Sequence, residues 1–323
     1  MMKALVYLGP LSMELREIDE PAGDVLVRVL GTGLCGTDLK TYLKGHHLFV
    51  PPTVLGHECY GRIERALPSS GFSRGELVAV APYLECGTCP TCLKGYGQLC
   101  VNKSYISGGC FAEFIAADAA YASRAFFRIP EASPAFALVE PLACVLNGVE
   151  KLRLGAGRTA LVVGGGPMGS LFGAVFEARG LPFAFVETNP GRASLLTGWG
   201  WKVVAPEGLP KREYDQIVLT VNKAELVPTY LGAAADGGNL LLFSGFSRQD
   251  LATIDPYEVH YREVSVTGSF GYARSHFVEA LALIVSSKER FEKLITHRLP
   301  LEKGVEAMGL LQRGEAMKIV IEP

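Results

Sequence analysis

The sequence has no apolar run of the ~18 residues that a membrane-spanning helix needs. It also has no basic cluster, because Lys and Arg are scattered and the formal net charge is only −2. The start of the chain, Met1–Pro10, has no cationic segment, apolar core or small-residue cleavage site of a signal peptide. These absences argue against a membrane protein, a nucleic-acid-binding protein and a secreted protein. We therefore expect a cytoplasmic protein whose partner is a small molecule.

The chain does have enough material for two ordinary domains. Its 323 residues exceed the usual length of one domain. A composition of 49% hydrophobic and 20% charged residues is a typical globular balance. We find no internal repeat and no low-complexity linker.

Four of the eight cysteines cluster in residues 86–100. They are Cys86, Cys89, Cys92 and Cys100. In a large chain without a signal peptide, clustered cysteines bind metal more often than they form disulfides. Four thiolates enclose zinc in a closed tetrahedral shell, and the intervening Gly and Pro residues let the backbone fold around one ion. The spacing therefore predicts a structural zinc site.

Disulfides, an iron–sulfur cluster and a nucleic-acid-binding zinc module are the alternatives for these cysteines. The ferredoxin pattern starts in a similar way, but its next cysteine comes sooner and is followed by proline. A nucleic-acid-binding module needs a basic surface, whereas only Lys94 and Lys103 lie nearby and Glu85 precedes the cluster. We therefore favour a structural zinc site.

A second set of potential metal ligands is spread along the chain. It consists of Cys35, His57, Glu58 and Glu140. One thiolate, one imidazole and two carboxylates fit a zinc ion that keeps an open position, as in a catalytic site. Alone, each residue would be an ordinary core or surface residue, so only the joint pattern favours the site. A thiolate at the start of a helix, here predicted over Thr37–Leu43, is also favoured by free N–H groups.

After Pro141 the sequence changes from short β runs to alternating strands and helices. Apolar strands that alternate with helices predict a parallel, doubly wound sheet. A Gly-x-Gly-x-x-Gly pattern follows the strand predicted at Thr159–Val163 and opens a helix, which is the context of a dinucleotide-binding turn. An acidic residue, Glu187, ends the next strand, where a carboxylate binds ribose hydroxyls and repels a 2′-phosphate. NAD is therefore favoured over NADP, although Arg192 could meet a phosphate.

These patterns predict an α/β protein of two domains. The first, residues 1–143 and 273–323, is an irregular β domain that carries both metal sites. The second, residues 144–272, is the doubly wound nucleotide-binding domain; six strands complete it, so the C-terminal tail should rejoin the first domain. The predicted cofactor-binding residues are Gly164, Gly166, Pro167, Met168, Gly169, Glu187 and Arg192.

Read together, the motifs resemble the zinc-dependent medium-chain alcohol and polyol dehydrogenase family, in its sorbitol and threonine dehydrogenase branch. The resemblance rests on Gly-Leu-Cys-Gly-Thr-Asp around Cys35, Gly-His-Glu at Gly56, the four-cysteine segment, Glu-Pro-Leu at Glu140 and the glycine-rich turn. It implies a GroES-like catalytic domain, a Rossmann domain, and a homodimer or homotetramer. We expect the metal to lie in the cleft between the domains, facing the dinucleotide.

The resemblance also implies roles for individual residues. Cys35 and His57 would hold a catalytic zinc, with Glu58 and Glu140 as direct or water-mediated ligands. Asp38 matches the residue that orients the histidine, and Thr37 matches the hydroxyl that starts a proton relay. The expected reaction is hydride transfer to NAD from a polyol, a secondary alcohol or a related hydroxy compound. The alternatives are an NADP-linked aldehyde or ketone reductase and a non-catalytic nucleotide-sensing protein on the same fold.

Overall fold

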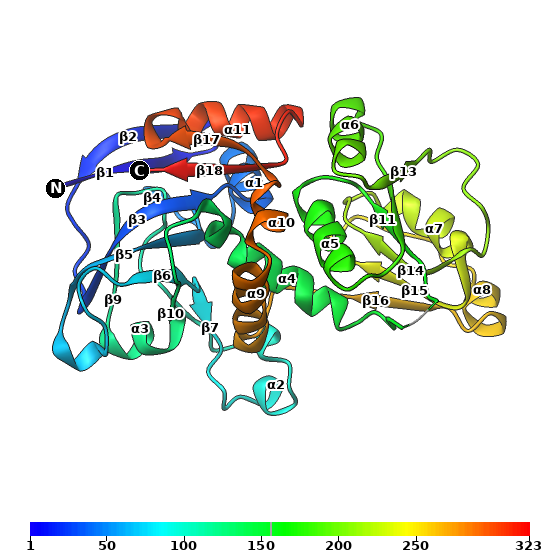
Figure 1. The fold of residues 1–323 in the computed structure, drawn as a ribbon, viewed down its shortest axis with the longest axis horizontal. Coiled ribbons are helices and arrows are strands. Elements are labelled where there is room, and N and C mark those ends of the chain that lie inside the picture. Colours follow the sequence, from blue (N-terminus) through cyan, green and yellow to red (C-terminus); the bar gives the residue numbers. More distant parts are fainter. Residues whose placement is uncertain (156) are drawn as a thin grey trace. The chain divides into compact units, whose positions relative to one another are not determined.

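The computed structural model describes residues 1–155 and 157–323, which form two compact units (Figure 1). Unit 1 consists of Met1–Ala143 and Tyr272–Pro323, and unit 2 consists of Cys144–Gly271. Among the described residues, no helix combines the length and the hydropathy needed to cross a bilayer.

Unit 1 is built on a sheet whose strands come from distant parts of the chain. Its order is β10-β6-β5-β3-β18-β17, with β9 also paired to β3. The strands are β3 (Val25–Gly33), β5 (Glu58–Ala66), β6 (Leu77–Val80), β9 (Phe114–Ala117), β10 (Phe126–Arg128), β17 (Ile295–Pro300) and β18 (Lys318–Glu322). Because β18 pairs with β3, the C-terminal tail belongs to the same sheet as the N-terminal strands.

Smaller sheets and short helices complete unit 1. One sheet joins β1 (Met2–Gly9), β2 (Ser12–Ile18) and β4 (Thr53–Val54), and another pairs β7 (Tyr83–Leu84) with β8 (Ser104–Tyr105). The helices are α1 (Gly36–Lys44), α2 (Pro90–Leu93), α3 (Ala119–Ala125), α9 (Arg274–Ser286), α10 (Lys288–Glu292) and α11 (Gly304–Arg313). One core cluster packs Leu5, Phe111, Met308 and Ile319 together, so β1, α11 and β18 share a hydrophobic core.

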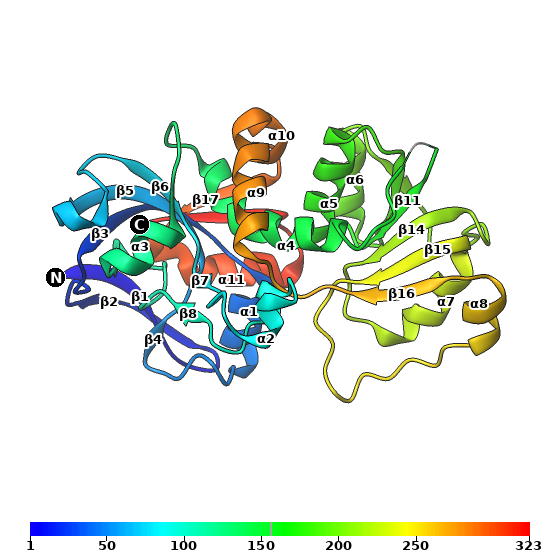
Figure 2. The same cartoon turned by 90° about the horizontal axis from the view of Figure 1, so that it is seen from below.

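Unit 2 is a six-stranded sheet of parallel strands in the order β13-β12-β11-β14-β15-β16. The strands are β11 (Ala160–Val163), β12 (Phe183–Val186), β13 (Lys202–Val204), β14 (Tyr214–Leu219), β15 (Ala234–Leu242) and β16 (Ser265–Gly268). The helices are α5 (Pro167–Ala178), α6 (Pro190–Gly198), α7 (Val227–Ala233) and α8 (Pro256–Tyr261). Figures 1 and 2 show α5 and α6 on one face of the sheet and α7 on the other. This is the dinucleotide-binding strand order, and it confirms the predicted fold class.

One helix, α4 (Val139–Val149), carries the chain from unit 1 into unit 2. Its first turn contains Glu140, which lies in unit 1. The fold thus places all the predicted metal ligands in unit 1 and the predicted cofactor-binding residues in unit 2.

Candidate active site

The mixed-ligand centre of unit 1 forms where α1 and β5 begin. Cys35 is the residue that caps the N-terminus of α1, and its sulfur accepts a hydrogen bond from the Thr37 N–H at 3.5 Å. His57 immediately precedes β5, and Glu58 is its first residue. One ligand atom from each of Cys35, His57 and Glu58 lies within 4.8 Å of the others. Three of the four predicted ligands therefore meet in one group.

Asp38 ties the two ligand segments together from a fully buried position. Its Oδ2 accepts a hydrogen bond from the Cys35 N–H at 3.0 Å, and its Oδ1 accepts one from the Gly56 N–H at 3.2 Å. The same Oδ1 lies 3.3 Å from His57 Nδ1. Burial lowers the pKa of His57, but the charges of Asp38 and Cys35 raise it well above its ordinary value. The negative charges around His57 therefore attract a cation. A metal ion that binds His57 requires this residue to release its proton.

Glu58 supplies the atom that best tests the fit of a metal. Its Oε2 forms an ion pair with Lys318 Nζ, and both side chains are buried. Its Oε1 is buried and has no hydrogen-bond partner in the described part of the chain. A buried carboxylate oxygen without a donor is costly, and a metal ion would satisfy it. With a thiol and an imidazole alongside, the donor set fits zinc.

Glu140 and Thr37 lie outside this group of three ligand atoms. Glu140 is 8% exposed, and burial is the main reason why its pKa is raised to about 7. The charge of Glu58 raises that pKa further, whereas the charge of His57 lowers it. The side chain of Thr37 is exposed in the first turn of α1.

The four-cysteine segment forms a second, separate group in unit 1. One sulfur from each of the four cysteines lies within 4.8 Å of the others, and Cys89 Sγ is 3.5 Å from Cys92 Sγ. Such distances are far longer than the ~2.05 Å of a disulfide, and all four thiols are free. Backbone N–H groups of Thr88 and Cys89 donate to Cys86 Sγ at 3.4 and 3.3 Å. Hydrogen bonds to sulfur favour the thiolate form, which is the form that binds metal.

In unit 2 the glycine-rich turn joins β11 to α5. Gly164 has a φ of 95°, and a Cβ on Gly169 would overlap the carbonyl oxygen of Gly164, so both positions require glycine. Pro167 and Met168 form the first turn of α5, after Gly166. The exposed backbone N–H groups of such a turn bind phosphate.

Glu187 and Arg192 flank this turn. Glu187 Oε2 accepts a hydrogen bond from the Gly165 N–H at 2.8 Å, and Oε1 accepts one from the Asn189 N–H at 2.7 Å. The guanidinium of Arg192 lies close to Gly166, since a Cβ there would be 3.6 Å from its Nη1. The buried Nε of Arg192 has no hydrogen-bond partner among the described residues. The turn is thus bordered by one anchored carboxylate and one cation.

Lys318 is the residue of this centre that the sequence reasoning missed. It is the first residue of β18 and is only 3% exposed. Burial lowers its pKa, but the charges of Glu58, Cys35 and Glu140 together raise it above its ordinary value. A signal was present, because a lysine directly precedes the apolar run Ile319–Ile321. A charge in such a strand is seldom fully buried unless it is paired.

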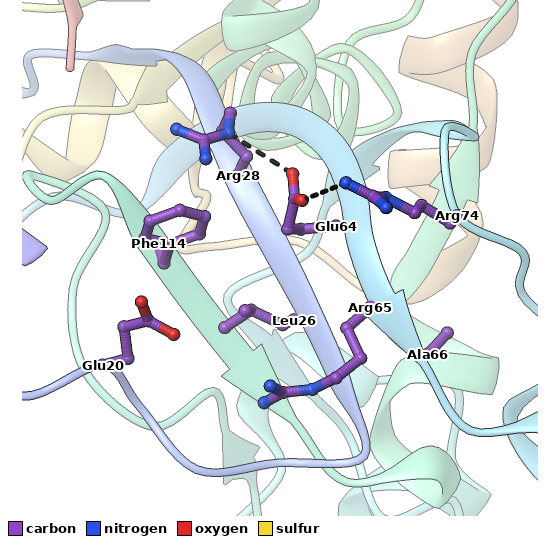
Figure 3. A pocket seen from close by; sticks show the side chains of 8 residues that line it. All are labelled: Glu20, Leu26, Arg28, Glu64, Arg65, Ala66, Arg74 and Phe114. Carbon is purple, nitrogen blue, oxygen red and sulfur yellow. Dashed lines mark hydrogen bonds and ion pairs between the residues drawn. The ribbon is translucent and has the colours of Figure 1, made fainter. Parts of the chain in front are cut away.

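A pocket of about 580 Å³ also lies in unit 1, but it contains none of the predicted site residues (Figure 3). Its charged lining is largely paired internally, because Glu64 contacts Arg28 at 3.4 Å and Arg74 at 2.8 Å. Arg28 also stacks over the Phe114 ring at 4.4 Å. This pocket does not take part in the chemistry discussed below.

Comparison with known proteins identifies the family. Residues 21–130 match the alcohol dehydrogenase GroES-like domain. D-altritol 5-dehydrogenase of Agrobacterium fabrum is 32% identical over 306 residues, which cover 90% of this chain and 89% of that protein. The chain belongs to the zinc-dependent medium-chain alcohol and polyol dehydrogenase family. It is an oxidoreductase, and the resemblance seen in its motifs is confirmed.

Further relatives of this dehydrogenase span more than nine-tenths of its length. L-galactonate-5-dehydrogenase of Escherichia coli is 27% identical over 93% of this chain and 92% of its own. The crystal structure of 2R,3R-butanediol dehydrogenase from Bacillus subtilis covers 100% of both chains, with a TM-score of 0.88 and 25% identity. A protein from Sinorhizobium meliloti, assigned as a zinc-binding dehydrogenase and bound to NADP, has a TM-score of 0.87 and 26% identity over 100% of this chain and 99% of its own.

Proposed function

We propose that this dehydrogenase oxidises a polyol or a related hydroxy compound with NAD, at a zinc ion held by Cys35, His57 and Glu58. Glu140 would be a further or water-mediated ligand. The observation that carries the proposal is the convergence of three ligand atoms within 4.8 Å of one another, together with a buried Glu58 oxygen that has no donor in the described part of the chain. A second, structural zinc would be held by Cys86, Cys89, Cys92 and Cys100. The names of the altritol and galactonate enzymes support a polyhydroxylated substrate.

The chain's own residues hold and orient the reacting groups. When bound, zinc supplies Lewis acidity that lowers the pKa of a substrate hydroxyl, and NAD supplies the hydride acceptor. Asp38 fixes the ring of His57 and the backbone N–H of Cys35, so both ligands keep one orientation. We assign the first proton transfer to the exposed hydroxyl of Thr37, which lies two residues beyond Cys35.

The choice of NAD rests on Glu187. Both of its carboxylate oxygens accept backbone hydrogen bonds, so the side chain is held in one position beside the glycine-rich turn. A fixed carboxylate there accepts hydrogen bonds from ribose hydroxyls and repels a 2′-phosphate. NADP is the competing cofactor, because Arg192 Nε has no hydrogen-bond partner among the described residues and the Sinorhizobium meliloti relative binds NADP.

The test is a panel of polyols, sugar acids and secondary alcohols with NAD or NADP, followed by the absorbance of the reduced nicotinamide. We expect two zinc ions per chain and at least tenfold higher kcat/KM with NAD for the best substrate. A His57→Ala control should lose one zinc and nearly all turnover. A clear preference for NADP would refute the role of Glu187, and zinc-loaded protein that reduces neither cofactor would favour a non-catalytic protein. Size-exclusion chromatography with light scattering tests the expected homodimer or homotetramer.

A further inference from the structure

Lys318 reaches Glu58 across strand β3. Gly33 of β3 lies opposite Glu58 of β5 on one side and Val320 of β18 on the other. A Cβ on Gly33 would overlap Glu58 Oε2 and would lie 3.0 Å from Lys318 Cε. The missing side chain at Gly33 is therefore what allows the carboxylate and the ammonium to meet inside the protein.

The ion pair leaves the two oxygens of Glu58 in different states. Oε2 is held by Lys318, whereas the buried Oε1 has no hydrogen-bond partner among the described residues. The side chains of Lys318 and Glu58 are only 4% and 0% exposed, so water cannot screen the pair. The ammonium of Lys318 is thus already paired with the carboxylate that a metal ion would bind.

We propose that Lys318 is a positioning residue that acts as the built-in counter-cation of the metal centre, holding Glu58 in place and weakening its bond to the metal. This inference rests on the proposed zinc site. Lys318 holds the carboxylate in place through Oε2. Loss of such a partner of a metal ligand typically lowers metal affinity about tenfold to a hundredfold. The charge of Lys318 acts in the opposite direction: at an effective dielectric constant of about 20, an ammonium and a dication held in one buried site would repel each other by a factor on the order of 10³ or more. Repulsion therefore wins, and removing the charge should tighten metal binding.

The test compares zinc affinity in Lys318→Met, Lys318→Gln and Lys318→Arg variants of the full chain. Each protein is titrated with a chromophoric zinc chelator at constant pH, and the zinc that disappears in His57→Ala is counted as that of this centre. We expect at least tenfold tighter binding in the Met and Gln variants, with the larger gain in Gln. Lys318→Arg keeps the charge and should stay within threefold of wild type. Gln can still donate to Glu58, so it provides a variant that folds if Met does not.

A double-mutant cycle with Glu58→Gln separates the two parts of the effect. In the Glu58→Gln background the repulsion remains but there is no carboxylate left to position, so Lys318→Met should tighten zinc binding more than it does in wild type. The cobalt-substituted protein gives a second readout, because its visible spectrum should shift in Lys318→Met and not in Lys318→Arg.

Two results would overturn the inference. One is zinc affinity that falls, or changes by less than threefold, in both neutral variants. The other is an equal effect of Lys318→Met with and without the Glu58 carboxylate. Failure of the proposed zinc site itself would look different, since wild type and His57→Ala would then release the same amount of zinc.

Discussion

The two potential metal sites of unit 1 are built in opposite ways. The four cysteines come from one short segment, residues 86–100, around the four-residue helix α2. The mixed centre takes Cys35 from the start of α1, His57 and Glu58 from the start of β5, and its counter-cation Lys318 from β18. A local site can close before the rest of the domain is ordered, whereas the mixed centre exists only once the sheet of unit 1 has formed.

The two potential metal sites also differ in their ligand chemistry. The cysteine group offers four sulfurs, the ligand set that encloses zinc in closed structural sites. The mixed centre offers three unlike ligands, of which one is a carboxylate shared with a lysine. The comparison suggests that the first site stabilises the fold and the second site activates a substrate.

The largest effect should follow from Cys35→Ala. Without the thiolate, zinc at the mixed centre should be lost and kcat/KM should fall by about 10³-fold or more, or about 4 kcal/mol. Thermal unfolding should change little, because the cysteine group keeps its own zinc. Activity assays, zinc analysis and a melting curve on one preparation check this. The control is Cys144→Ala, which removes a thiol outside both groups. Activity within tenfold of wild type would show that Cys35 holds no catalytic metal.

The second-largest effect should follow from Cys89→Ser, which should lower stability and leave activity nearly unchanged. Loss of a thiolate opens the closed shell, and we expect a loss of about 3 kcal/mol, seen as a melting temperature about 10 °C lower. At low temperature the folded fraction should keep kcat within about threefold of wild type. Leu93→Ala, at an exposed position of α2, is the matched control. An unchanged melting temperature together with lost turnover would reverse the roles of the two sites.

The sequence could predict the cysteine group and the nucleotide-binding sheet because their signals are local. Ligand spacing marks residues 86–100, and the strands β11 and β12 are short apolar runs, each followed by a helix. The strand β12 lies at the predicted Phe183–Val186, and the fold class is confirmed. The mixed centre was predicted only from the joint pattern of distant residues, and the roles of its members remain proposals.

The pairing of Lys318 with Glu58 could not be predicted, because it is decided by the order and register of the strands. The two residues are 260 positions apart, and they meet because β3 lies between β5 and β18 and carries glycine at the crossing. Spacing in the sequence contains no information on that register. The position of Glu140 could not be predicted either, because its distance from the other ligands depends on how α4 leaves the sheet of unit 1.

The smallest effect should follow from Asp38→Asn. The amide keeps the shape of the side chain but loses the charge that orients His57, which typically weakens metal binding by about 10- to 100-fold. We expect a similar fall in kcat/KM, or about 1.4–2.7 kcal/mol, with little change in the cysteine-bound zinc. The matched control is Asp118→Asn, because Asp118 accepts a hydrogen bond from the Tyr121 N–H at 2.6 Å at the start of α3. If both variants lost the same amount of zinc, Asp38 would be only a helix cap, and the mixed centre would not depend on it.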